Sequence, residues 1–190
     1  MEVIGICGSP RHANTEYMIK EVLEATESNY QIIHLADKNI YSCTGCKTCH
    51  QNYQCKIDDD MQDIYSKLKD AKGIVLGSPT YFDNVSGIMK NFMDRCLPFW
   101  AEGFSQDLSG KRVGLVTSAN FENYVEFDKN GNCKYHEEET QSALKCLSAL
   151  EDFSRHIGFE IIGKVYALHS DPHSKKDELV GLGKKLILKE

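Results

Sequence analysis

The 190-residue sequence predicts an α/β fold in which helices cover both faces of a five-stranded parallel sheet. Two observations predict this fold, namely the alternation of two kinds of segment and the length of the chain. Short apolar segments with strand character alternate along the chain with longer segments whose apolar residues recur at helical spacing. Such alternation implies right-handed βαβ crossovers and therefore parallel strands. The length suits one domain, residues 1–190, whose core is large enough to fold without disulfides.

The predicted strands are short and apolar, as expected for strands buried on both faces. The clearest lie at residues 3–7 (VIGIC) and 74–76 (IVL). The five predicted strands span residues 2–7, 30–35, 73–77, 112–117 and 160–167.

The predicted helices follow these strands in turn. The longest places Ala143, Leu147 and Leu150 on one face and has Gly158 directly after it, which is a common helix end. The five predicted helices span residues 14–25, 60–70, 86–96, 138–157 and 175–188. With this alternation and length we predict a doubly wound, flavodoxin-like sheet with the strand order 2-1-3-4-5.

Two segments exceed this minimal design. Residues 36–59, here called the cysteine loop, follow the second predicted strand and contain four closely spaced cysteines. Residues 121–137 form an insertion before the fourth helix, and their segment 128–132 (DKNGN) indicates a hairpin turn.

The bulk composition excludes several classes of protein. A net charge of −6 argues against a nucleic-acid binder, which would carry a basic face. No apolar segment approaches membrane-spanning length, and the start of the chain lacks the apolar core of a secretory signal. We therefore expect a cytoplasmic protein that binds neither nucleic acid nor membrane. In that reducing compartment, eight cysteines indicate metal or redox chemistry rather than disulfides.

A polar loop follows the first predicted strand and contains Ser9, Arg11, Asn14 and Thr15. It matches neither a Walker A loop nor a dinucleotide fingerprint. Its side chains offer hydroxyl, amide and guanidinium donors at the start of a helix whose dipole favours an anion. The loop therefore indicates a phosphate-monoester site, although an ordinary polar turn before a helix uses the same residue types.

The cysteine loop carries the pattern C-x2-C-x2-C-x5-C at Cys43, Cys46, Cys49 and Cys55. Three evenly spaced thiolates and a fourth after a longer gap are typical of a [4Fe–4S] site. Structural zinc sites more often present two separated C-x2-C pairs, but His50 would offer zinc a further ligand. A redox dithiol at Cys43 and Cys46 is the third interpretation.

A second loop, residues 77–87 (GSPTYFDNVSG), follows the third predicted strand. Together with residues 8–15 it resembles the flavin-binding loops of the NAD(P)H-dependent FMN reductase family. The resemblance implies that backbone N–H groups of the second loop contact the flavin ring. The third loop, residues 118–120, lacks the glycines usual in that family. The implied FMN-binding residues are Ser9, Arg11, Asn14, Thr15, Pro79, Thr80, Tyr81, Phe82, Asp83, Asn84, Ser118 and Asn120.

The cysteine pattern inside such a chain resembles the iron–sulfur flavoproteins of anaerobic archaea and bacteria. This resemblance implies one [4Fe–4S] cluster on the four cysteines of the loop, with FMN bound separately. It also implies a homodimer or a dimer-based homotetramer in which the cluster of one subunit approaches the flavin of another. Because the cysteine loop leaves the carboxyl end of the second strand, we further expect both cofactors at the same edge of the sheet.

FMN and a [4Fe–4S] cluster together suit electron transfer. The expected function joins a one-electron carrier such as ferredoxin to a two-electron donor or acceptor, which would make the chain a flavin-dependent oxidoreductase. Two alternatives stay open. The first is an NAD(P)H-dependent FMN or quinone reductase whose cysteine loop holds zinc or nothing. The second is a redox sensor or interaction module without turnover.

Overall fold

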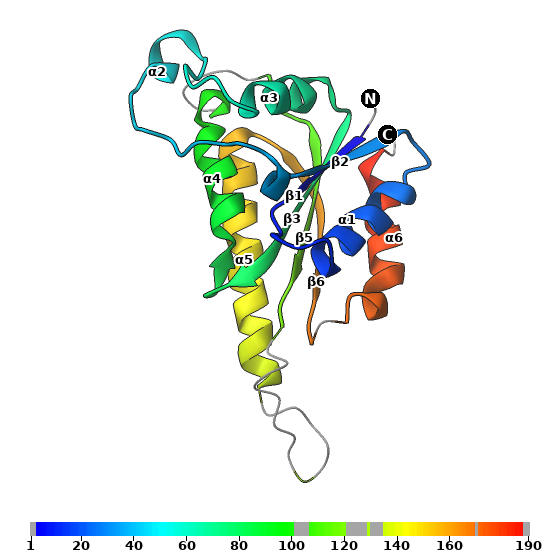
Figure 1. Cartoon of the computed structure of the whole chain (residues 1–190). Helices are drawn as coiled ribbons and strands as arrows, with labels where there is room; N and C mark the ends of the chain where they lie inside the picture. The colour runs from blue at the N-terminus through cyan, green and yellow to red at the C-terminus, as the bar shows by residue number, and fades with distance from the viewer. Residues whose placement is uncertain (1–2, 101–106, 121–128, 130–134, 170, 188–190) are drawn as a thin grey trace.

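The central sheet contains five parallel strands in the order β2-β1-β3-β5-β6, and the short β4 pairs antiparallel with the end of β3 (Figure 1). Apart from β4, this is the predicted order 2-1-3-4-5, which is confirmed. The computed structural model describes residues 3–100, 107–120, 129, 135–169 and 171–187. The strands are β1 (Val3–Cys7), β2 (Tyr30–His34), β3 (Gly73–Tyr81), β4 (Asn84–Val85), β5 (Arg112–Ser118) and β6 (Glu160–Ala167).

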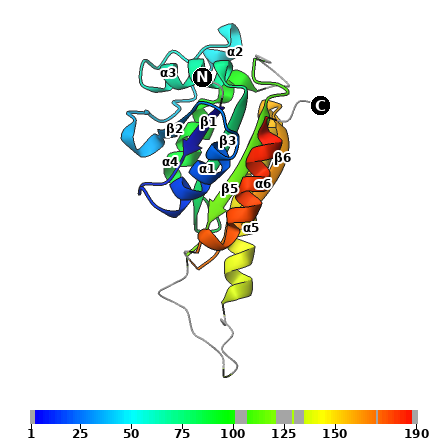
Figure 2. The same cartoon turned by 90° about the vertical axis from the view of Figure 1, so that its right-hand side faces the viewer.

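Helices cover both faces of the sheet, as the two views show (Figures 1 and 2). Helices α1 and α6 share one buried cluster with the sheet, and α3, α4 and α5 share the other. Both predicted helical layers are therefore confirmed. The α-helices within the described residues are α1 (Asn14–Glu24), α2 (Cys49–Asn52), α3 (Met61–Asp70), α4 (Gly87–Arg95), α5 (His136–Ile157) and α6 (Lys176–Leu186).

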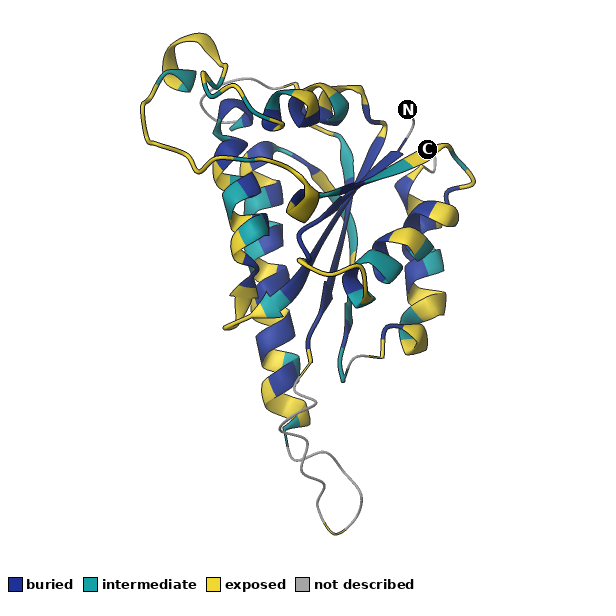
Figure 3. Cartoon of the chain, in the orientation of Figure 1, coloured by how far each residue is buried: buried dark blue, intermediate teal, exposed yellow. Residues whose placement is uncertain are grey.

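Strand β1 shows why the central strands are apolar without interruption. Successive side chains of a strand point to opposite faces. Val3 and Cys7 accordingly join the cluster under α1 and α6, whereas Ile4 and Ile6 join the cluster under α3, α4 and α5. All four side chains are completely buried. Figure 3 shows similar burial along β3 and β5, only partial burial along the edge strands β2 and β6, and an exposed surface on the segment around α2.

Strand β3 is longer than the sequence predicts. The expected strand ends at Gly77, but Ser78 and Pro79 continue the parallel pairing with β5. The chain then turns back at Phe82 and Asp83, both in the left-handed region with φ of 48° and 61°, and β4 completes a hairpin. The segment predicted as a loop after the third strand is therefore largely a β-hairpin.

Most of the predicted insertion, residues 121–137, lies outside the described residues, and so does most of its predicted turn at 128–132. Within the described residues, α5 begins at His136, two residues before the predicted start. None of the helices in the described ranges combines the length and the apolar character needed to cross a membrane.

Candidate functional site

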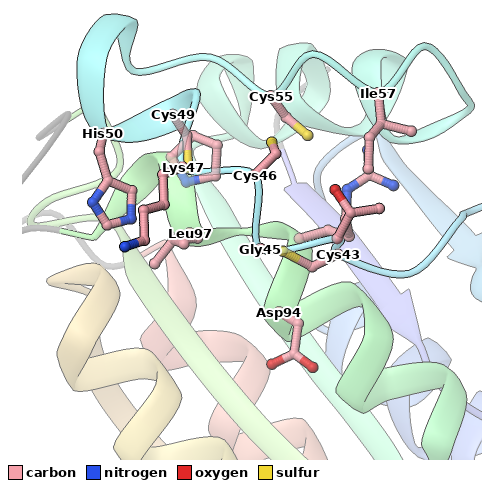
Figure 4. A pocket seen from close by; sticks show the side chains of 13 residues that line it. Cys43, Gly45, Cys46, Lys47, Cys49, His50, Cys55, Ile57, Asp94 and Leu97 are labelled. Atoms are coloured by element: carbon pink, nitrogen blue, oxygen red, sulfur yellow. The ribbon is translucent and has the colours of Figure 1, made fainter.

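The four cysteines of the cysteine loop line one cavity of about 200 Å³. Cys43 and Cys46 come from the first arm of the loop, Cys49 begins the short helix α2, and Cys55 lies on the returning arm. Figure 4 shows the four side chains around the same pocket. The structure therefore brings together the predicted ligand set. His50 lines the cavity as well, so the alternative zinc ligand is also in place.

Left-handed backbone turns give the cysteine loop its curvature. Gly45 has a φ of 65°, and Lys47 and Tyr53 have φ of 60° and 59°. Glycine adopts this region without steric penalty, whereas other residues adopt it only where their surroundings require it. These reversals lie between or just after the first three cysteines, and they let closely spaced residues surround one volume instead of following one helix.

A buried ion pair between Arg95 and Asp59 fixes both arms of the cysteine loop to the end of α4. The guanidinium donates from Nη1 to Oδ2 at 2.6 Å and from Nη2 to Oδ1 at 3.0 Å, and both side chains are fully buried. Nη1 also donates to the carbonyl oxygen of Tyr41 at 2.7 Å, and the carboxylate accepts from the Tyr41 N–H at 2.9 Å. Because Tyr41 precedes Cys43 and Asp59 follows Cys55, one ion pair holds the segment at both ends.

The charges of this pair are mutually stabilised. Burial acts to raise the pKa of Asp59, but hydrogen bonds from Arg95 and from backbone N–H groups outweigh it and lower that pKa from its ordinary 3.8. Burial acts to lower the pKa of Arg95, and the hydrogen bond with Asp59 turns the net shift upward. Both groups are therefore ionised at neutral pH.

Arg95 also has one donor that the ion pair does not use. It lines the cavity beside the cysteines, and among the described residues its buried Nε–H has no hydrogen-bond acceptor. An unsatisfied buried donor is unfavourable by roughly 1–3 kcal/mol or more. An anionic group that is bound in the cavity and reaches this N–H would satisfy it. This observation fits a negatively charged centre held by thiolates.

The thiols themselves differ in acidity. Hydrogen bonding with Thr48 lowers the pKa of Cys46 from 9.0 to about 7, and the two side chains lie 3.4 Å apart. Burial raises the pKa of Cys49, and the charges of the other three cysteines add to that rise. Four thiolates in one cavity repel one another unless a metal centre neutralises them. Thiolate ligation is what iron–sulfur clusters and structural zinc require.

A second cavity, of about 440 Å³, lies at the carboxyl ends of β1, β3 and β5. It is lined by nine of the twelve residues predicted to bind FMN and by Ala13, which the sequence reasoning missed because alanine offers no polar group. The nine are Ser9, Arg11, Asn14, Thr15, Pro79, Thr80, Tyr81, Ser118 and Asn120.

Three predicted FMN-binding residues do not line this cavity, because they form the hairpin between β3 and β4. Phe82 is fully exposed at its tip. The Asp83 carboxylate accepts from Lys145 Nζ of α5 at 2.6 Å, and this contact lowers its pKa. Asn84 uses its side-chain oxygen to accept from the Val85 N–H at 2.8 Å.

Hydroxyl contacts hold the three loops around the cavity together. Thr15 Oγ1 and Ser118 Oγ lie 3.1 Å apart and join the first loop to the third. Thr80 Oγ1 and Thr117 Oγ1, also 3.1 Å apart, join the ends of β3 and β5. Ser9 Oγ donates to the carbonyl oxygen of Arg11 at 2.7 Å and shapes the first loop from within.

The two cavities lie at opposite ends of α4, which corrects the expectation that both cofactor sites share one edge of the sheet. The cysteine loop leaves β2 at the carboxyl edge, but it runs back past α4 (Figure 1). Its cavity is lined by Arg95, the last residue of α4, and by Leu97 beyond the helix end. The other cavity is lined by Pro79 and Tyr81, before the helix begins. A nine-residue helix spans about 13 Å.

This fold, with a polar cavity at the carboxyl ends of its central strands, defines a flavodoxin-like protein. A flavodoxin from the domain Archaea has the same fold, with a TM-score of 0.58 at 16% identity over 98% of this chain and 96% of that protein. Residues 1–126 match the family model of NADPH-dependent FMN reductases. The chain belongs to that family.

Curated relatives of the chain are named as iron–sulfur flavoproteins. One from Methanocaldococcus jannaschii is 45% identical over 102 residues, which are 52% of this chain and 53% of the relative. Another from the same organism is 33% identical over 135 residues, 69% of this chain and 64% of the relative. The predicted resemblance is confirmed. The chain spans about half the length of the first of these relatives.

Replacing Asp59 with asparagine should leave Arg95 buried without its counter-charge. We expect the free energy of unfolding near neutral pH to fall by about 3–5 kcal/mol. The folded-state pKa of Asp59 is depressed, so its contribution is complete above the unfolded value of 3.8 and is lost as pH falls through the folded value. The difference in free energy of unfolding between wild type and variant should therefore become smaller in acid. Urea unfolding at several pH values would measure it.

The control for this measurement is Asp58→Asn, which changes the exposed neighbour. It should shift the free energy of unfolding by less than about 0.5 kcal/mol. Equal losses in the two variants would show that the ion pair does not stabilise the fold.

Proposed function

We propose that this chain is an electron-transfer flavoprotein that holds a [4Fe–4S] cluster on Cys43, Cys46, Cys49 and Cys55 and FMN in the cavity at the sheet edge. The observation that carries the proposal is the convergence of four cysteines with a buried arginine donor on one cavity. Membership of the FMN reductase family supports the flavin, and the names of the relatives support the cluster.

The residues around the larger cavity suit FMN in two parts. Arg11, Asn14 and Thr15 would hold the phosphate, since they line the cavity at the start of α1, where the helix dipole favours an anion. Pro79 and Tyr81 line the same cavity and would flank the flavin ring. We retain the hairpin tip, Phe82 to Asn84, as a secondary contact at the rim, because it directly follows Tyr81.

The bound groups would supply the electron chemistry: FMN exchanges electrons singly or in pairs, and an iron–sulfur cluster exchanges them singly. The contribution of the protein is placement and tuning. Arg95, whose charge Asp59 already balances, would offer the cluster its remaining N–H donor. The Thr48 hydroxyl accepts from the Cys46 thiol here and would donate to that sulfur once it ligates as a thiolate. Such a chain would connect a one-electron carrier of the ferredoxin type with a two-electron donor or acceptor.

We further propose that a second copy of the chain completes the electron path. The two cavities of one chain lie at opposite ends of α4, so the helix separates them. In a homodimer or a dimer-based homotetramer, the cysteine loop of one copy would approach the flavin cavity of another. The exposed position of the loop fits such a contact (Figure 3).

A second candidate function is NAD(P)H-dependent reduction of FMN or a quinone, with zinc in the cysteine loop. His50 favours it, because this side chain lines the cysteine cavity and would complete a zinc site. A redox sensor without turnover would show the same cofactors but no sustained electron transfer to a carrier.

Removal of one ligand tests the proposal. Protein purified without oxygen should contain about four irons, four sulfides and one FMN per chain. Cys46→Ala should lose the iron and keep the FMN, because the two cavities are separate. The control Gln51→Ala alters an exposed side chain of the same loop and should keep both. Stoichiometric zinc in the wild type, with FMN present and iron absent, would favour the reductase instead.

A second variant tests the flavin cavity. Arg11→Gln should weaken FMN binding by about 10- to 100-fold, since hydrogen bonds to charged groups are worth about 1.5–3 kcal/mol. Riboflavin lacks the phosphate, so its affinity should stay unchanged. Fluorescence titration gives the affinity of wild type and variant for FMN and for riboflavin. Lys20→Gln, on the exposed surface of α1, is the charge-matched control. Equal weakening of both flavins would contradict the phosphate role.

A further inference from the structure

Three side chains with metal-ligating atoms lie together at the carboxyl edge of β1 and β2. They are His12, Glu16 and His34, and one donor atom from each lies within 4.8 Å of the other two. His12 Nδ1 lies 3.0 Å from Glu16 Oε2, and His34 Nε2 lies 3.3 Å from Glu16 Oε1. The two imidazole rings have their centroids 4.2 Å apart. The predicted roles of the loops use none of these three residues.

Three separate elements position this cluster. His12 belongs to the loop between β1 and α1, and Glu16 lies one turn later on α1, where it faces His12. His34 is the last residue of β2 and pairs in register with Cys7 at the end of β1. The sheet therefore fixes one ligand, the helix fixes the second, and the loop presents the third.

The donor set and its spacing suit a divalent transition metal. Imidazole nitrogen and carboxylate oxygen bind zinc at about 2.0–2.2 Å, so tetrahedral ligand atoms lie roughly 3.3–3.6 Å apart. The observed separations of 3.0 and 3.3 Å end on different oxygens of Glu16, Oε2 and Oε1, and one atom from each of the three residues lies within 4.8 Å of the others. A small rotation of the carboxylate would therefore bring one oxygen into that range for both imidazoles. Asp37 Oδ2 lies 3.7 Å from His12 Nε2, the other ring nitrogen, which is within ion-pair range but beyond hydrogen-bond distance. A shift of this exposed carboxylate by less than about 1 Å would let it orient His12, as carboxylates commonly do for metal-bound histidines.

We propose that His12, Glu16 and His34 form a binding site for one divalent transition-metal ion of the zinc type. The side chain of His12 is 59% exposed, that of Glu16 is 29% exposed and that of His34 is 14% exposed. The ion can therefore enter from solvent, and its fourth position remains for water.

The site lies directly behind the loop that the proposed function assigns to the FMN phosphate. Arg11 and Ala13 line the flavin cavity, but His12 between them turns to Glu16 and His34 instead. A metal ion on His12 would hold this loop from its outer side. By linkage, the ion and FMN should then strengthen each other's binding by the same factor. This coupling rests on the proposed FMN site, whereas binding of the ion does not.

Zn²⁺ is the probe for the test, applied to chain purified without oxygen so that the four cysteines keep the metal centre they carry, whether or not FMN is bound. Calorimetry should show one Zn²⁺ per chain, and His12→Ala and Glu16→Gln should each weaken it by about 100-fold or more, since losing an outer partner alone weakens sites 10–100-fold. His156→Ala, a control on the exposed surface of α5, should bind Zn²⁺ as the wild type does. Circular dichroism verifies that each variant is folded.

Two results would overturn the metal site: no Zn²⁺ binding by the wild type, or binding that persists in His12→Ala and Glu16→Gln. In the second case the ion lies elsewhere, and loss of iron on adding Zn²⁺ would place it in the cysteine loop. Titration of FMN with and without Zn²⁺ separates the two proposals. Zn²⁺ binding without any FMN binding supports the metal site and contradicts the proposed function, and FMN binding without Zn²⁺ binding does the reverse.

Discussion

The buried ion pair between Arg95 and Asp59 is the constraint on which the cysteine site depends. A charged pair is unfavourable to bury unless its hydrogen bonds are well formed. Here the carboxylate accepts from the guanidinium, from the N–H of Tyr41 and from the N–H of Met61. These contacts tie the two arms of an exposed loop to the last residue of α4. The loop itself buries little apolar surface, so this anchor gives its cysteines a defined position.

Helix α4 in turn determines how far apart the two cavities lie. Ser86 caps its start by accepting from the Met89 N–H and donates to the carbonyl oxygen of Gly8, which ties the helix to the loop after β1. Arg95 ends it at the cysteine cavity. One rigid element therefore connects both candidate cofactor sites and also keeps them apart. This arrangement explains why the proposed electron path runs between copies of the chain.

The sequence predicts local secondary structure well, but it does not predict contacts between residues that are far apart along the chain. The parallel sheet and its helices are predicted from the alternation of apolar patterns. The spacing of the four cysteines is enough to predict that they share one metal or cluster site. The path of the cysteine loop depends on Arg95, which lies 36 residues beyond Asp59 and has no local signal. The cluster around Glu16 likewise needs the register of β2 against β1. Such contacts arise only when distant segments pack together.

A crystal structure of protein purified without oxygen, with anomalous scattering measured at the iron edge, tests the central claim most directly. The account predicts an iron cluster in the cavity bounded by Arg95 and the four cysteines, and FMN in the separate cavity beside Arg11. It also predicts that the cysteine loop of one copy lies next to the flavin of another. A single zinc ion or a disulfide among these cysteines would contradict it.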